Sequence, residues 1–192
     1  MSKALFIVDV QNDFTEGGAL GVEGGDAVAE RITQYLSAHA GEYSMIIASR
    51  DWHDDDNDNG GHFHPEPDYV DTWPSHCVAG TEGAEYDPAL VVESVTHHVK
   101  KGQGEAAYSL FEGVTDEGHK VSDLLTEHGI LDVDVTGIAT DYCVRASALH
   151  AIEHGRHVRI LTDLIAGVAP ESSEAALAEL AHAGAVLAES GA

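Results

Sequence analysis

Three side chains that could together perform nucleophilic catalysis lie at the ends of strand-like runs. They are Asp9, Lys101 and Cys143. In a parallel sheet every strand brings its carboxyl end to the same edge, so these groups are expected to meet there. A cysteine at the start of a helix faces unpaired N–H groups and the positive end of the helix dipole, which favour the thiolate. A nearby carboxylate can take the thiol proton, and a lysine can keep that carboxylate ionised.

The turn that carries Cys143 also offers backbone donors. The N–H groups of Ala139 and Cys143 are candidates for an oxyanion hole, which stabilises negative charge on a carbonyl oxygen. Each side chain alone has an ordinary explanation, since a cysteine is often a small buried hydrophobe and an aspartate often caps a turn. The convergence of the three favours catalysis. The other cysteine, Cys77, lies in a loop near proline with no helix start beside it, so we predict that it only packs.

A second group of side chains, in the irregular stretch at 51–88, could bind a metal ion. Asp51 and His53 are two residues apart, so an extended backbone points both side chains to one side. His62 and His76 could complete a set of three histidines and one carboxylate. Such a set suits zinc, iron or manganese, with water at the open positions. Long structureless stretches inside a compact domain are usually functional.

The same stretch also contains a different candidate metal motif. Asp55, Asn57, Asn59, Gly60 and Glu66 stand at the spacings of an EF-hand calcium loop, which would make the chain a calcium-binding module. An EF-hand requires a helix on each side of its loop. Here a strand-like run precedes the motif and a proline-containing segment follows it, so the transition-metal site is favoured.

Strand-like and helix-like segments alternate along the whole chain. This alternation predicts an α/β fold with a mostly parallel sheet and helices on both of its faces. A chain of 192 residues can bury one substantial core, so a single domain spanning 1–192 is expected. The expected strands are 4–9, 44–50, 95–101, 132–138 and 157–163, and the expected helices are 26–38, 119–128, 144–155 and 170–184.

The charge composition restricts the partners. Against 9 Lys and Arg the chain carries 34 Asp and Glu, a formal net charge of −25. Such a surface repels nucleic acid and anionic membranes, so neither is expected as a partner. The excess also suggests a protein adapted to a high-salt cytoplasm, where ions screen the repulsion. No membrane span or secretory leader is visible, which predicts a cytoplasmic location, and the sequence leaves homo-oligomerisation open.

Six segments, in order along nearly the whole chain, carry a family resemblance. They are "FIVDVQNDFTEGGAL", "ASRDWH", "GGHF", "WPSHCVAGT", "KGQGEAAYSLFEG" and "GIATDYCVRASALHA". Together they resemble the cysteine hydrolases of the isochorismatase-like superfamily, most closely the nicotinamidases. The resemblance implies a Rossmann-like three-layer α/β fold, a triad of Asp9, Lys101 and Cys143, and a cis peptide bond from Ile138 to Ala139. It selects Lys101 over Lys100 because the spacing to "AYS" fits the family pattern.

The resemblance also implies the metal ligands and the walls of a substrate pocket. The family's D-x-H…H…H set maps onto Asp51, His53, His62 and His76, with one divalent metal bound, zinc first and iron or manganese as alternatives. The insert "DDDNDNG" lengthens this loop and leaves His62 and His64 both open as the third ligand. Aromatic pocket walls map onto Phe14, Trp73 and Tyr108.

The activity implied by the resemblance is hydrolysis of a small carboxamide. Nicotinamide would be converted to nicotinate and ammonia through a thioester on Cys143, as a step of NAD salvage. Two other activities of the superfamily remain as alternatives. Isochorismatases hydrolyse a vinyl ether without relying on this cysteine, and carbamoyl-amide hydrolases keep a similar triad but generally lack the metal set. The presence of both features in this sequence argues against each.

Overall fold

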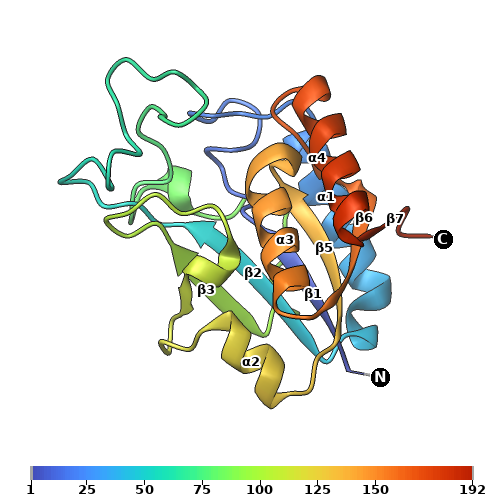
Figure 1. Ribbon diagram of the computed structural model, residues 1–192. Helices are drawn as coiled ribbons and strands as arrows, with labels where there is room; N and C mark the ends of the chain where they lie inside the picture. The colour runs from blue at the N-terminus through green and yellow to red at the C-terminus, as the bar shows by residue number, and fades with distance from the viewer. Residues whose placement is uncertain (1, 192) are drawn as a thin grey trace.

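The computed structural model describes residues 2–191, which build one seven-stranded sheet with helices on both faces (Figure 1). The strand order is β4-β3-β2-β1-β5-β6-β7, and every neighbouring pair is parallel except β3 and β4. The expected mostly parallel α/β fold is confirmed. The strands are β1 (Lys3–Val8), β2 (Met45–Asp51), β3 (His97–Lys101), β4 (Val114–Thr115), β5 (Asp132–Ile138), β6 (His157–Ala166) and β7 (Val186–Ala188).

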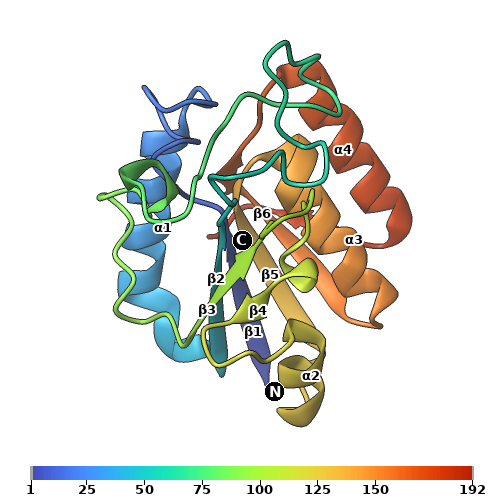
Figure 2. The same cartoon turned by 90° about the vertical axis from the view of Figure 1, so that its left-hand side faces the viewer.

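The helices divide between the two faces of the sheet, as Figure 2 shows. One face is covered by α1, while α2, α3 and α4 lie on the opposite face. A short π-helical turn, Thr140–Val144, joins β5 to α3. The helices are α1 (Gly25–His39), α2 (Val121–Glu127), α3 (Arg145–Glu153) and α4 (Pro170–Ala183).

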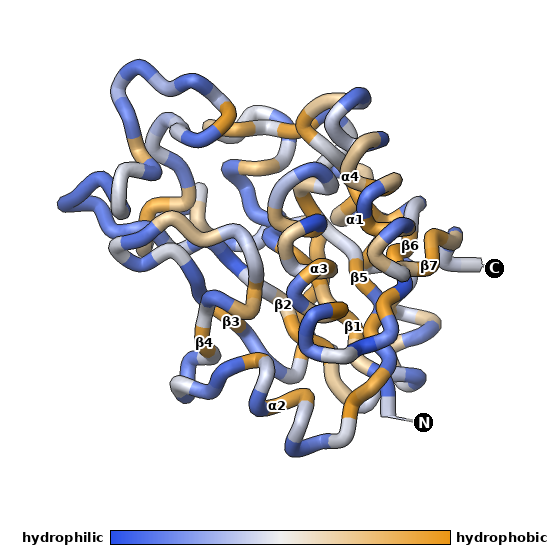
Figure 3. Tube along the Cα trace, viewed as in Figure 1, coloured by the Kyte–Doolittle hydropathy of each residue, from blue (hydrophilic) through white to orange (hydrophobic). Residues whose placement is uncertain are grey.

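The alternation of side chains along the central strand explains the two cores. Leu5 and Ile7 pack against the α1 side, and Phe6 and Val8 belong to the core on the other side. All four side chains are fully buried, as expected for a parallel strand covered on both faces. Figure 3 shows the resulting hydrophobic central strands and the mostly hydrophilic loop that follows β2.

The helix ends follow sequence signals. Pro170 opens α4, where its missing N–H costs nothing because first-turn N–H groups have no partner within the helix. Gly184 closes the same helix at φ 108°, a left-handed conformation that favours glycine. Among residues 2–191, no helix combines the length and the apolar character needed to cross a membrane.

Two short strands differ from the expectation, whereas the connection from β2 to β3 is irregular, as the stretch at 51–88 was expected to be. The edge strands β4 and β7 contain two and three residues, which is too short for a periodic pattern to be visible. The connection from β2 to β3 has no α-helix, and its only helical element in the described chain is a 3-10 turn at Glu82–Ala84. The rest of this connection is held by isolated bridges, such as His53 to Val78 and Phe63 to Trp73.

Candidate active site

The carboxyl edge of the sheet brings the expected catalytic side chains together. Asp9 follows the last residue of β1, Lys101 is the last residue of β3, and Cys143 lies in the π-helical turn after β5. Asp9 and Lys101 are completely buried, and Cys143 is 6% exposed. Because β3 and β5 flank the pair formed by β2 and β1, groups far apart in the sequence meet at one place.

Lys101 is the centre of this group. Its Nζ lies 3.0 Å from Oδ2 of Asp9 and 3.7 Å from Sγ of Cys143. The other Asp9 oxygen, Oδ1, accepts a hydrogen bond of 2.7 Å from the Ser49 hydroxyl. The carboxylates of Asp9 and Asp51 and the Cys143 sulfur all lie within 4.8 Å of one another. A nucleophile, a base and an orienting cation are therefore within reach of each other.

Burial controls the protonation of the triad. Burial raises the pKa of the Cys143 thiol well above its ordinary value, and the charge of Lys101 opposes this effect only in part. Burial also raises the pKa of Asp9, against the lowering effect of Lys101. For Lys101 burial lowers the pKa, but the carboxylates of Asp51 and Asp9 outweigh it and the pKa is raised.

These shifts correct one expectation. A helix start was expected to favour the thiolate of Cys143, but burial raises the pKa of this thiol, and the lowering effect of Lys101 does not outweigh it. The resting thiol therefore keeps its proton and needs a base. Asp9, with its raised pKa, is the more effective proton acceptor for that reason.

The turn before Cys143 has the expected backbone. The peptide bond from Ile138 to Ala139 is cis, which confirms that expectation. The N–H groups of Tyr142 and Val144 both donate to the Ala139 carbonyl at 3.1 Å. The N–H of Cys143, between them, takes part in neither bond. It stays a candidate oxyanion donor together with the N–H of Ala139.

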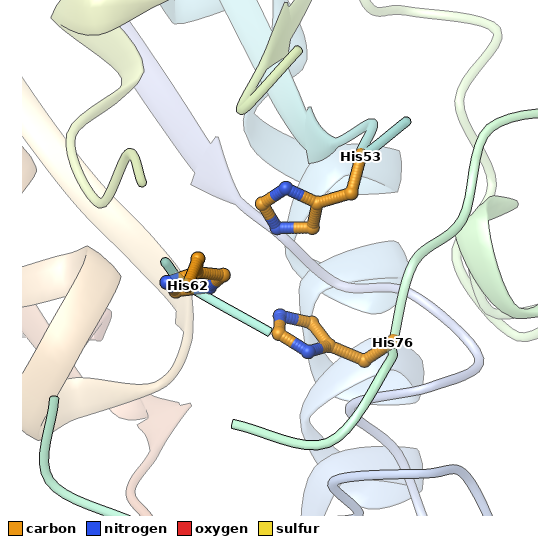
Figure 4. Close-up of side chains that lie close together, drawn as sticks. All are labelled: His53, His62 and His76. Atoms are coloured by element: carbon orange, nitrogen blue, oxygen red, sulfur yellow. The ribbon is translucent and has the colours of Figure 1, made fainter. Parts of the chain in front are cut away.

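Three histidine rings converge, as Figure 4 shows. His53, His62 and His76 are buried, and each can offer a ring nitrogen within 4.8 Å of the nitrogens of the other two. Asp51 faces the same cluster, since its Oδ2 lies 3.7 Å from Nε2 of His53 and 3.9 Å from Nε2 of His76. The other oxygen of Asp51 contacts Lys101, so this carboxylate joins the histidine cluster to the triad.

The hydrogen bonds of the rings leave metal-binding nitrogens free. Nδ1 of His53 donates to the Gly102 carbonyl at 2.8 Å, and Nδ1 of His76 to the Pro74 carbonyl at 2.8 Å. Nε2 of His53 and Nδ1 of His62 are buried without a hydrogen-bond partner. Burial lowers the pKa of His62 to about 3 and that of His76 to about 4, so both rings are neutral at pH 7. Neutral, oriented imidazoles beside a carboxylate fit one divalent metal ion.

The choice between His62 and His64 has a clear geometry. His62 is 2% exposed and lies in the cluster, whereas His64 is exposed and its Nδ1 accepts a hydrogen bond from the N–H of Glu66.

The EF-hand alternative lacks its helices, because the motif follows the strand β2 and no α-helix lies between β2 and β3 in the described chain. The Asn59 side chain is buried and bonds to the backbone of Asp54 and Gly104. The loop therefore holds itself together with side chains that an EF-hand would give to calcium.

A cavity of about 250 Å³ leads to Cys143 and to the histidine cluster. Its walls include Phe14, Trp73 and Tyr108, the aromatic residues expected there. Trp73 is fixed by a hydrogen bond of 3.1 Å from its Nε1 to the Tyr108 hydroxyl. Further residues that line the cavity were not expected from the sequence, and four of them are Val22, Tyr69, Tyr142 and Val168.

Of these four, only Tyr142 had a usable signal in the sequence. The signal is its place directly before Cys143. In the structure its ring packs edge-on against Trp73, with the ring centroids 5.0 Å apart. Val22, Tyr69 and Val168 lie in loops, where no periodicity shows which way a side chain points.

Cys77 is fully buried outside the cavity lining, and its N–H donates to Asp13 at 2.7 Å.

Comparisons with known proteins show the family of this chain. Residues 3–191 match the isochorismatase domain family. The nicotinamidase/pyrazinamidase of Mycobacterium tuberculosis is 47% identical over 178 residues, which cover 93% of this chain and 94% of that protein. The nicotinamidase of Escherichia coli is 33% identical over 200 residues, covering 96% of this chain and 93% of the relative.

Two solved structures are similar over almost their full length. The pyrazinamidase of Pyrococcus horikoshii in complex with zinc has a TM-score of 0.83 and 37% identity, and the match covers 98% of this chain and 99% of that one. PnC1 from L. infantum in complex with nicotinate has a TM-score of 0.83 and 34% identity, covering 99% of this chain and 93% of that one.

Proposed function

This chain belongs to the isochorismatase family, and we propose that it is a nicotinamidase, which hydrolyses nicotinamide to nicotinate and ammonia. The observation that carries the proposal is the burial of Cys143, Asp9 and Lys101 together at a cavity with aromatic walls and a histidine cluster. The nicotinamidases among its relatives and the nicotinate complex of a similar structure support the same substrate.

The first half of the reaction forms a thioester. Asp9 takes the proton of Cys143, whose thiolate attacks the carboxamide carbon and forms a carbon–sulfur bond. The N–H groups of Ala139 and Cys143 stabilise the oxyanion of the tetrahedral intermediate. The carbon–nitrogen bond then breaks, Asp9 returns its proton to the nitrogen, and ammonia leaves. Lys101, 3.0 Å from Asp9, orients the carboxylate and favours its ionised form between these steps.

The second half of the reaction releases nicotinate, and Asp9 again accepts a proton and then returns it. Asp9 takes a proton from a water molecule, which attacks the thioester carbon. The carbon–sulfur bond breaks, and the thiolate of Cys143 recovers the proton from Asp9. Burial of all three side chains excludes bulk water and strengthens their electrostatic interactions.

One divalent metal fits the residues beside the triad. Asp51, His53, His62 and His76 would hold it, and the zinc in the similar pyrazinamidase supports zinc. When bound, such an ion acts as a Lewis acid, which can orient a ring nitrogen or lower the pKa of a bound water. The pairing of this site with Cys143 favours nicotinamidase over the isochorismatase and carbamoyl-amide alternatives.

The organisation and location of the protein are part of the proposal. The chain is one domain spanning 1–192, with a metal-binding loop at about 51–88, and the family match over residues 3–191 supports this. It acts in the cytoplasm in NAD salvage, on a small-molecule substrate. The absence of a membrane-spanning helix among residues 2–191 is compatible with that location.

Ammonia release from nicotinamide tests the proposal. The purified protein is assayed as isolated, after chelation, and after re-addition of zinc, iron or manganese one at a time. We expect activity that chelation removes and one metal restores. Benzamide, which lacks the ring nitrogen, is the control and should be hydrolysed more slowly. No ammonia from nicotinamide with any of the three metals would refute the proposal.

A further inference from the structure

The end of β2 loses its backbone neighbour on the β1 side. The two strands pair in register from Ala4 with Met45 to Ile7 with Ala48, and then the chain turns away at Asp9, whose φ is 48°. This turn places the Asp9 carboxylate at the triad. It also leaves Asp51, which is 2% exposed, without a strand beside it on that side. A buried N–H and C=O without partners would cost free energy.

The side chain of Gln11 takes the place of the missing strand. Its Oε1 accepts the N–H of Asp51 at 2.8 Å, and its Nε2 donates to the Asp51 carbonyl at 2.9 Å. The same Nε2 donates to the Ala84 carbonyl at 2.9 Å. The side chain is completely buried, and both of its polar atoms are bonded. A carboxamide that bonds both backbone groups of one residue acts as the peptide group of a neighbouring strand would.

The residue that Gln11 holds serves both parts of the site. One oxygen of Asp51 contacts Lys101, and the other lies 3.7 Å from Nε2 of His53 and 3.9 Å from Nε2 of His76. The direction of this carboxylate depends on the backbone of Asp51. Gln11 is outside the residues that line the cavity, so it acts on the site only through other residues.

We propose that Gln11 is a positioning residue, whose carboxamide fixes the backbone of Asp51 and so aims its carboxylate at the metal and at Lys101. This inference rests on the proposed function, because it takes Asp51 as a metal ligand. Residues that orient metal ligands typically change metal affinity about 10–100-fold when they are replaced. The expected effect of losing the carboxamide is therefore a weaker zinc site in a folded protein.

The test is the zinc affinity of metal-free protein, measured by competition with a chromogenic chelator. Gln11→Met keeps the length and burial of the side chain but makes none of the three hydrogen bonds. It should bind zinc about 10–100-fold more weakly than the unmodified protein. The matched control is Thr136→Val, which removes another buried hydrogen bond, 2.8 Å from Oγ1 to the Phe6 carbonyl, in the same sheet. The control should lose thermal stability without losing zinc affinity.

The outcomes separate this inference from the proposed function. Gln11→Met with unchanged zinc affinity would overturn the positioning role, and so would an equal loss in Thr136→Val. If Gln11→Met does not fold, Gln11→Asn decides, because its shorter carboxamide cannot reach both backbone groups and should also weaken zinc binding. Failure of the proposed function would instead be visible in the unmodified protein, as a lack of ammonia release from nicotinamide.

Discussion

The ammonium group of Lys101 lies 3.0 Å from the carboxylate of Asp9, and neither side chain has any exposed surface. Lys101 also contacts Asp51 and approaches the Cys143 sulfur to 3.7 Å. One buried cation therefore compensates two buried carboxylates. It is needed for the stability of the site as well as for its chemistry, because an unpaired buried charge is costly.

We expect Lys101→Met to be strongly destabilising as well as inactive. The substitution leaves two buried carboxylates without a cation, and removal of one partner from a buried ion pair costs about 3–5 kcal/mol. Urea unfolding measures the loss, and ammonia release measures the activity. Lys100→Met is the matched control, because the neighbouring Lys100 pairs with Asp116, which is half exposed. Its cost should be about 0–1 kcal/mol, with activity kept. Equal effects of the two variants would contradict the assignment.

We expect Cys143→Ala to abolish ammonia release and Cys77→Ala to retain it. Only the first sulfur lies in reach of Asp9 and Lys101, whereas Cys77 packs outside the cavity lining. The assay is ammonia release from nicotinamide, with circular dichroism to verify folding. Turnover by a folded Cys143→Ala protein would refute the nucleophile.

We expect His62→Ala, but not His64→Ala, to lose zinc. His62 is buried with an unpartnered ring nitrogen, while His64 is exposed and bonded within its own loop. Zinc content after dialysis against a weak chelator is the measurement. The reverse pattern would show that the loop rearranges around the ion and uses His64.

Asp134 should make the stability of the protein depend on pH at its acidic end. Burial alone would raise the pKa of Asp134, but hydrogen bonds from Arg159, Lys3 and Tyr43 outweigh it, and the pKa is lowered. A lowered folded-state pKa means that the stabilisation is complete above the unfolded pKa of about 3.9 and is lost as the pH falls through the folded value.

The measurement is the free energy of unfolding of Asp134→Asn and of the unmodified protein. At pH 7 the variant should be less stable by about 1.5–3 kcal/mol, the value of hydrogen bonds to a charged group. The difference should begin to shrink below a pH of about 3.9, where the aspartate of the unfolded chain becomes neutral, and should be lost only below the lowered pKa of the folded protein. A difference that does not depend on pH would contradict this role.

The net charge of −25 predicts that salt stabilises the fold. Like charges repel across the surface, and the Debye length falls from about 10 Å at 0.1 M to about 3 Å at 1 M salt. The urea midpoint should therefore rise between 0.1 M and 1 M potassium chloride. A midpoint that is already maximal at low salt would remove the idea of adaptation to a high-salt cytoplasm.

Most of the fold could be predicted from the sequence because its strands are long and apolar. The run at 4–9 and the alternating valines at 132–138 became β1 and β5 with boundaries shifted by one residue at most. The strands β4 and β7 were missed because a few residues cannot show a period. Their places at the two edges of the sheet come from tertiary packing.

The site was less evenly predictable. Convergence at the sheet edge brought Asp9, Lys101 and Cys143 together, since strand ends in a parallel sheet are ordered by topology. The state of the thiol was not predictable, because depth of burial is a property of the whole fold. The role of Gln11 was also invisible, since it depends on where β1 turns away from β2.

The complete burial of Lys101 has a consequence for an enzyme with so acidic an exterior. Dissolved ions crowd around the outside of the molecule, yet buried pairs are screened much less than surface ones. The electrostatic interactions between the reacting groups therefore depend little on the ionic strength of the solution. The surface charge could therefore change during adaptation to high or low salt, while the attraction between this ammonium group and its carboxylates would stay nearly constant.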